Sequence, residues 1–150
     1  MKLWVDADAC PREVKDVIFR AAERLQIACV LVSNSDLRLP RSSFVSSVRV
    51  GAGLDVADKY IVEHAEPGDL AVTADIPLAA ALVKKGVRAL DPRGELYDED
   101  NVHERLAMRD LMKELRDGGM ALGGPKSFDS RDKQQFANAL DRELSRLRRP

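Results

Sequence analysis

The sequence predicts an α/β fold: a single three-layer domain with a mainly parallel, five-stranded sheet. Short apolar segments alternate along the chain with segments whose apolar residues recur at helical spacing. Such alternation of strand and helix is typical of a parallel sheet covered by helices on both faces. A length of 150 residues, with 45% apolar and 33% charged residues, is typical of one globular domain. We expect this domain to span 1–150, with a core at 1–92 and a helical part at 93–150.

The first half of the chain contains three of the five expected strands. Residues 2–5 form a short apolar run, and helical spacing of apolar residues follows over 11–25. Residues 27–32 are apolar throughout, as expected of a strand that is buried on both faces. Residues 44–50 predict a third strand, and a second helix is expected to begin near Asp55.

The second half completes the sheet and adds two helices. Residues 70–73 and 87–90 predict the fourth and fifth strands, and a helix over 76–86, closed by glycine, lies between them. Beyond the sheet we expect two amphipathic helices, at 101–117 and 131–148. Between them, residues 117–130 are rich in glycine and predict a loop that would order over a ligand.

The overall composition limits the classes of partner. A net charge of −1 argues against a protein that coats nucleic acid by bulk charge, although it does not exclude a local basic face. No apolar run approaches the roughly 18 residues of a membrane span, and the first residues do not predict a secretory signal, so we expect a cytoplasmic protein. Two cysteines form neither a disulfide framework nor a zinc site. We favour a structural role for Cys10, although a thiol at a helix start can also be reactive.

Aspartates follow three of the predicted strands. Asp6 and Asp8 follow the first strand, Asp55 and Asp58 follow the third, and Asp75 follows the fourth. Ligands of open α/β sheets bind outside the carboxyl ends of the strands, where the strand order reverses. If both are helical, Asp55 and Asp58 share one face of the first turn. We therefore expect several carboxylates to meet in one crevice.

Converging carboxylates repel one another, and a divalent cation relieves that repulsion. Oxygen ligands from aspartate suit Mg²⁺ or Mn²⁺ rather than zinc. Such an ion assists displacement at a phosphodiester. Taken singly, Asp8 and Asp58 are better explained as helix caps or first-turn acids. Thr73 and Ser33 end apolar strands, where each would orient a water molecule or bond to neighbouring backbone.

Several motifs in the sequence carry a family resemblance. Nearly the whole chain resembles the bacterial YaiI/YqxD family of uncharacterised proteins. The resemblance is carried by the motifs "VDADACP", "VSNS", "GLDVADKYI", "TADIPLAAALVKKG", "DPRG" and "GGPKSFDSRDKQQFANALD". That family is similar to the PIN-like nuclease superfamily and, within it, to NYN ribonuclease-like domains. The resemblance implies a PIN-like fold and a metal-dependent ribonuclease site in which Asp6, Asp55 and Asp75 hold the ion.

One position departs from the NYN pattern. Pro77 stands where that pattern has a further acid, so Asp8 or Asp58 would have to supply the missing oxygen. Basic residues in suitable places would position the backbone of an RNA substrate. Our candidates for binding substrate are Arg12, Arg93, Lys126, Thr73 and Ser33. Arg93 and Lys126 stand out because each lies inside a family-like motif.

Two other functions stay open from the sequence. A phosphatase of the haloacid-dehalogenase type also begins with a strand and D-x-D, which would make Asp6 the nucleophile and Asp8 the general acid. Against this, no lysine matches that family, and "GLDVAD" is left without a role. The second alternative is a non-catalytic protein that binds RNA or a nucleotide in a decayed nuclease crevice, which Pro77 favours.

Overall fold

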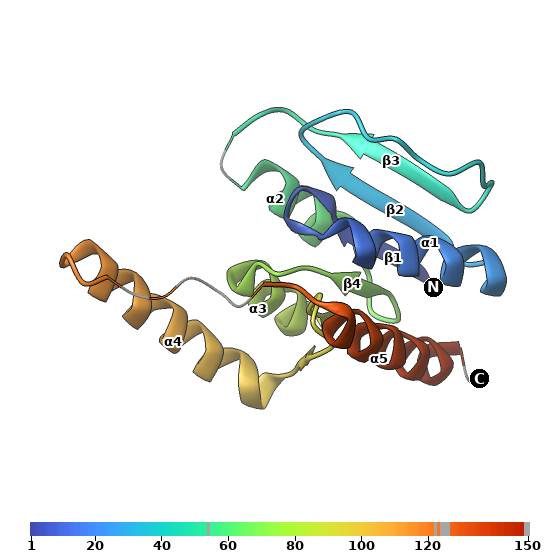
Figure 1. Cartoon of the computed structure of the whole chain (residues 1–150). Helices are drawn as coiled ribbons and strands as arrows, with labels where there is room; N and C mark the ends of the chain where they lie inside the picture. The colour runs from blue at the N-terminus through green and yellow to red at the C-terminus, as the bar shows by residue number, and fades with distance from the viewer. Residues whose placement is uncertain (54, 122, 124–126, 149–150) are drawn as a thin grey trace.

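Six strands form one sheet with helices on both faces, which gives three layers (Figure 1). This computed structural model describes residues 1–53, 55–121, 123 and 127–148. The elements in chain order are β1 (Lys2–Asp6), a 3₁₀ turn (Ala7–Ala9), α1 (Arg12–Leu25), β2 (Ala28–Ser33), β3 (Val45–Arg49), α2 (Val56–His64), β4 (Leu70–Val72), α3 (Ile76–Lys85), β5 (Arg88–Leu90), β6 (Leu96–Tyr97), α4 (Glu99–Asp117) and α5 (Ser130–Arg148). The predicted α/β class with its mainly parallel sheet is confirmed.

The strand order is β3-β2-β1-β4-β5-β6. The chain first moves outward from β1 to β3 and then returns to place β4 on the other side of β1. Strands β1 to β5 all run parallel to one another, whereas β6, which pairs with β5, runs antiparallel. The order therefore reverses between β1 and β4, and a crevice is expected at the carboxyl ends of these two strands.

The short strand β6 adds one strand to the five that the sequence predicts. The "DPRG" segment turns the chain back, and Asp91 and Glu95 bond through their backbones across the turn. Two residues, Leu96 and Tyr97, then pair with β5. A strand of two residues is too short to produce a period-two pattern in the sequence, which is why it could not be predicted.

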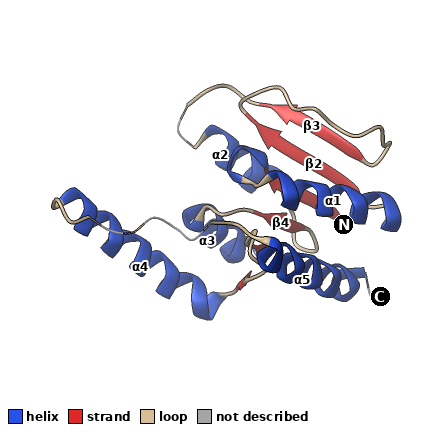
Figure 2. Ribbon diagram, viewed as in Figure 1, coloured by secondary structure: helices blue, strands red, loops and turns tan. Residues whose placement is uncertain are grey.

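Helices cover the two faces of the sheet in two groups (Figure 2). Helices α1 and α5 pack on one face, and α2, α3 and α4 pack on the other. Leu3 and Val5 of β1 belong to the first core, whereas Trp4 between them belongs to the second. Since strand side chains alternate between faces, Asp6 points with Trp4 toward α2 and α3.

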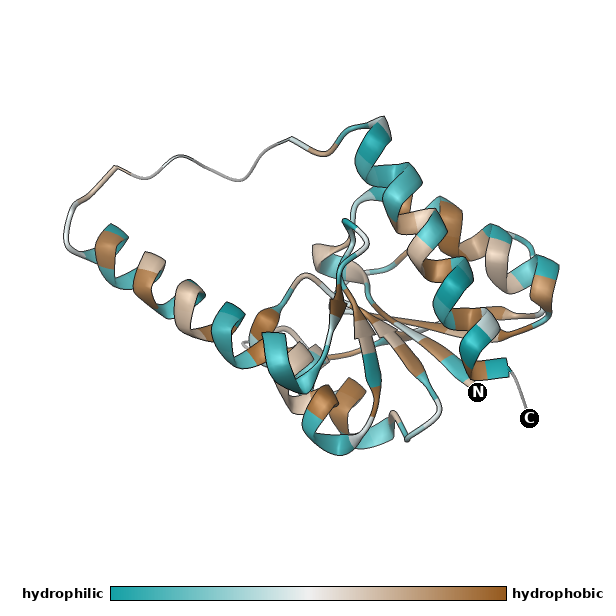
Figure 3. Cartoon of the chain, turned by 90° about the horizontal axis from the view of Figure 1, so that it is seen from below, coloured by the Kyte–Doolittle hydropathy of each residue, from teal (hydrophilic) through white to brown (hydrophobic). Residues whose placement is uncertain are grey.

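Helix α4 packs on α3 only with its first half. Val102 is the one residue of α4 that is fully buried. The second half of α4 extends away from the sheet, as Figure 3 shows, and exposes Met108, Leu111 and Met112. In the described part of the chain, no helix combines the length and the apolar character that crossing a membrane requires.

Candidate active site

Asp6 and Thr73 mark the point where the strand order reverses. Asp6 ends β1 and is 6% exposed, and Thr73 directly follows β4. The hydroxyl of Thr73 donates a hydrogen bond of 2.9 Å to the Asp6 carboxylate and accepts one of 2.9 Å from the amide of Asp75. Burial raises the pKa of Asp6, and the charges of Asp75 and Asp8 raise it further, while the bond from Thr73 acts against this.

Asp75 begins α3 as its N-cap residue. Its carboxylate accepts a hydrogen bond of 3.1 Å from the amide of Leu78, and Pro77 occupies the first turn, where a missing N–H has no cost. Pro77 thus has a structural explanation in the start of the helix. The cap also fixes the Asp75 carboxylate at the same edge of the sheet as Asp6.

Asp58, in the first turn of α2, completes the convergence of acids. Its pKa is raised to about 7, first by burial, then by the charges of Asp75 and Asp6, by a hydrogen bond with Asp75, and by the charge of Asp55. These causes require all four carboxyl groups to lie near one another. The expected meeting of acids from separate strand ends therefore holds for Asp6, Asp55, Asp58 and Asp75.

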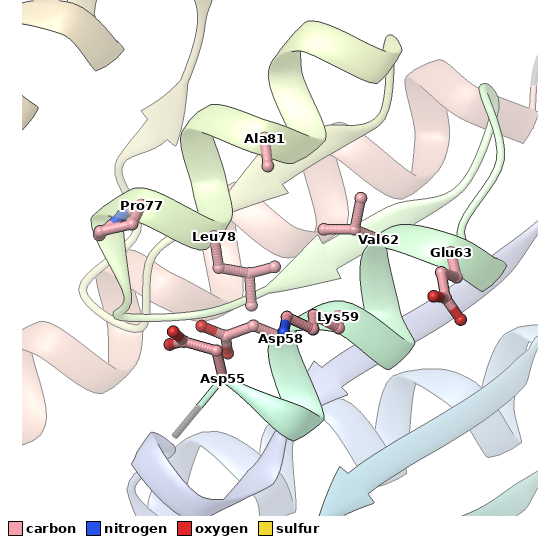
Figure 4. Close-up of a pocket in the computed structure, with 8 residues that line it drawn as sticks. All are labelled: Asp55, Asp58, Lys59, Val62, Glu63, Pro77, Leu78 and Ala81. Carbon is pink, nitrogen blue, oxygen red and sulfur yellow. The ribbon is translucent and has the colours of Figure 1, made fainter. Parts of the chain in front are cut away.

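Asp55 differs from expectation in its backbone. It is the N-cap residue of α2, with a φ of 64°, so it lies just outside the helix instead of in its first turn. Aspartate tolerates this left-handed conformation better than most residues. Asp55 and Asp58 nevertheless present their carboxylates to the same side, as the close-up in Figure 4 shows.

Asp8 and Ser33 form a separate pair. The Ser33 hydroxyl donates a 2.7 Å hydrogen bond to one Asp8 oxygen, and the amide of Asn34 donates a 2.9 Å bond to the other. Ser33 follows Leu31 by two residues and so faces the α1 side of the sheet, opposite to Asp6. Asp8 thus joins the end of β1 to the end of β2. Its charge acts on Asp6, but it is not among the acids that act on Asp58.

The donor chemistry of the four acids suits a hard divalent ion. All four offer carboxylate oxygens, and neither histidine lies among them. Among the described residues, however, no group of three histidine, cysteine, aspartate or glutamate side chains is arranged to hold a metal ion. The arrangement instead brings two acids, Asp58 and Asp75, into direct contact, with the other two nearby.

The candidate basic residues have different surroundings. Arg93 forms an ion pair of 2.8 Å with Asp132 at the start of α5 and lies over the ring of Phe128. Lys126 lies outside the described residues. Arg12 is exposed at the start of α1, where Lys15 and Arg38 line the same pocket. Sequence reasoning did not single out Lys15, because a pocket between a helix and a loop leaves no local pattern.

Cys10 is buried, as is Cys29. Burial raises the pKa of the Cys10 thiol to about 12, so it stays protonated at neutral pH. A structural role, which the sequence favoured, fits this environment. Glycine-rich residues 117–130, expected as a loop, lie partly outside the described residues; those described between Gly118 and Asp129 form no helix or strand.

Comparison with known proteins identifies the family. The model of the family described as "Uncharacterized BCR, YaiI/YqxD family" matches residues 4–146. A UPF0178 protein of Myxococcus xanthus is 61% identical over 147 residues, which cover 98% of this chain and 96% of that protein. A UPF0178 protein of Geobacter metallireducens is 59% identical over 147 residues, covering 98% and 95%. No solved structure matches the chain. The chain therefore belongs to the YaiI/YqxD family, as its motifs indicate.

Proposed function

We propose that this protein is a Mg²⁺- or Mn²⁺-dependent nuclease that hydrolyses phosphodiester bonds of RNA. The observation that carries the proposal is the convergence of carboxyl groups from three separate parts of the chain: Asp6 at the end of β1, Asp55 and Asp58 at the start of α2, and Asp75 at the start of α3. Bringing like charges together lowers the stability of the folded protein, and groups of this kind are found mainly at functional sites. The acids also lie at the reversal of strand order, where α/β proteins bind their ligands.

The four acids fit the way in which Mg²⁺ is usually held. Proteins commonly bind this ion through one or two carboxylates, together with waters and phosphate oxygens of the substrate. Asp58 and Asp75 would supply the two carboxylates, and Asp6 and Asp55 would add negative charge beside them. When bound, the ion offsets the charge of the phosphate during in-line displacement. Asp6, held in place by Thr73, keeps the geometry of the group constant.

Cations on α1 and on the loop after β2 support a polyanionic substrate. Arg12, Lys15 and Arg38 line one pocket at the start of α1, and no ion pair joins them to an acid in the described part of the chain. Arg93, by contrast, is already paired with Asp132. We therefore place the phosphate backbone over α1 and the loop after β2, and give Arg93 a supporting structural role.

The first test measures binding of the ion. We expect Mg²⁺ or Mn²⁺ to raise the melting temperature of the wild-type protein, because an ion that binds only the folded state stabilises it. Asp75→Asn should abolish this increase, and since asparagine is as good a helix cap, the fold should persist. Asp98→Asn is the matched control, because Asp98 caps α4 through the same type of bond. An equal increase in Asp75→Asn would reject the proposed ligand.

The second test measures cleavage of a labelled RNA oligonucleotide. Wild type and Asp98→Asn should cleave it in Mn²⁺, a chelator should stop the reaction, and Asp75→Asn should be inactive. Cleavage that persists in Asp75→Asn would contradict the assignment.

Two further outcomes correspond to the alternative functions. Hydrolysis of a phosphomonoester that depends on Asp8 would favour the haloacid-dehalogenase type, but both oxygens of Asp8 already accept hydrogen bonds from the β2 end. Binding of the ion and of RNA without turnover would favour a non-catalytic RNA- or nucleotide-binding protein. Pro77, which stands where the NYN pattern has a further acid, favours this second alternative.

A further inference from the structure

A groove between α2 and α3 opens directly beside the converging acids. Its volume is about 450 Å³, which falls within the range of roughly 300 to 1,000 Å³ typical of small-ligand sites. Asp55 and Asp58 stand at one end. In Figure 4 the side chains of Val62, Leu78 and Ala81 point into the space between the two helices. The groove therefore joins an apolar wall to an acidic end.

The groove exists because its walls carry small or short side chains. Ala81 projects from α3 toward Val62 of α2, and a larger residue at either position would fill the space between them. Lys59 and Glu63, both exposed, lie on α2 along the same groove. They offer one hydrogen-bond donor group and one acceptor group to the polar edge of a ligand.

The shape and charge of the groove restrict the chemistry of its ligand. The part within the groove must be apolar on its faces, to contact Val62 and Leu78, and polar on its edge. The end of the ligand that lies beside Asp55 and Asp58 meets negative charge. An anionic group can bind there only if a divalent cation lies between it and the two carboxylates. A nucleotide combines these properties, since its base has apolar faces and polar edges and its phosphate binds such a cation.

We propose that the groove between α2 and α3 receives the unpaired base of a nucleotide next to the scissile phosphate, which makes single-stranded RNA the substrate class. This inference rests on the proposed function for the identity of the reacting group. Bases within a duplex are stacked and paired, so their faces cannot enter a groove. A single strand presents its bases without that cost.

The test fills the groove from each wall separately. Ala81→Leu adds side-chain volume from α3, and Val62→Phe adds it from α2, while neither changes an acid. Ala81 also borders a second groove, between α3 and α4, as does Ala80. Ala80→Leu is therefore the matched control for Ala81→Leu. Val62 does not line the second groove, so an equal loss of binding in Val62→Phe and Ala81→Leu excludes an effect through α4. Thermal melting verifies that all three variants fold.

The first measurement is calorimetric binding of adenosine 5′-monophosphate in the presence of Mg²⁺. Wild type and Ala80→Leu should bind it, and both filling variants should bind it at least about tenfold more weakly, because the base loses its apolar contact with the groove walls. Wild-type affinity in both filling variants, or no binding to wild type at millimolar nucleotide, would overturn the proposal. The increase in melting temperature caused by Mg²⁺ should be the same in all four proteins.

The second measurement separates this inference from the proposed function. The same labelled RNA is offered as a single strand and annealed to its complement, and we expect the single strand to be cleaved at least about tenfold faster. Cleavage that is equal on both forms, or unaffected by filling the groove, would reject the groove as a base site and leave the nuclease in place. Groove-dependent binding of the nucleotide without cleavage would support the groove and reject the nuclease.

Discussion

The hydroxyl of Thr73 connects two aspartates that come from different segments of the chain. It donates to Asp6, which ends β1, and accepts from the backbone of Asp75, which begins α3. A buried carboxylate without a partner would be costly, so this bond stabilises Asp6 where it stands. A single side chain thus contacts both the Asp6 carboxylate and the backbone from which the Asp75 carboxylate extends.

Asp58 is the residue at which the convergence of acids should be measurable without any substrate. Its pKa rises from an ordinary 3.8 to about 7 in the folded protein. The folded state therefore keeps a proton that the unfolded state has released over this range, and that contribution to stability is complete below the lower pKa and lost as the pH rises through the higher one.

We therefore predict that Asp58→Asn stabilises the metal-free protein at pH 8 relative to wild type. Because Asp58 is only partly buried and water screens its charge, we expect a gain of about 1 kcal/mol in the free energy of unfolding. The gain should shrink as the pH falls toward the ordinary pKa, where both states hold the proton. Urea unfolding in a chelator over this pH range measures the difference. A difference that does not change with pH would contradict the raised pKa.

At the scale of elements, the turn between β5 and β6 depends on a close approach to α5. Gly94 has a φ of 95°, and a Cβ built on it would lie 2.7 Å from the backbone oxygen of Gln135 in α5. Only glycine satisfies both the left-handed conformation and the lack of space. The same turn carries Arg93 to Asp132, so the end of the sheet and the start of α5 are joined by an ion pair and by backbone packing.

We predict that Gly94→Ala destabilises the protein by about 3 kcal/mol, because the new methyl group meets backbone that cannot move aside without shifting α5. Gly68→Ala is the control, since Gly68 has a similar φ of 98° but nothing within 4 Å of its Cβ position. It should cost only the conformational strain, about 1 kcal/mol. Equal losses in the two variants, measured by chemical unfolding, would mean that packing against α5 contributes nothing.

Across the whole molecule, stability is distributed unevenly. Strand β1 lies between β2 and β4, with Leu3 and Val5 fully buried. The outer half of α4 has no buried residue, and Met108 and Leu111 are 51% and 47% exposed. Segments with few buried contacts open at a lower free energy than the core does. The outer half of α4 should therefore open independently of the sheet.

Hydrogen exchange followed by mass spectrometry tests this expectation. Amides of β1 should exchange only when the whole protein unfolds, and amides at 108–117 should exchange roughly 100-fold faster or more, because only local helix bonds protect them. Residues at the start of α4, next to Val102, should be intermediate. Protection at 108–117 equal to that of β1 would show that a contact such as self-association covers this half of α4.

The sequence by itself determined the order of strands and helices and the strand ends that carry aspartate. Both follow from local patterns: period two or continuous apolar runs for strands, helical spacing for helices, and charge at the point where an apolar run stops. Family membership also followed from the sequence, because the motifs are contiguous. Local pattern could not predict β6, which is two residues long, or the left-handed conformation of Asp55.

Only the tertiary structure decided which acids form one group. Side chains alternate between the faces of a strand, so Asp6 and Thr73 point toward α2 and α3, whereas Ser33 lies across the sheet, where its hydroxyl holds Asp8. Pairing of Arg93 with Asp132 and the groove beside Ala81 likewise depend on helices that are distant in the chain. The spacing of residues along the chain predicts helices, strands and the residues at their ends. Distances between side chains of different elements are set only when the sheet and its helices pack together.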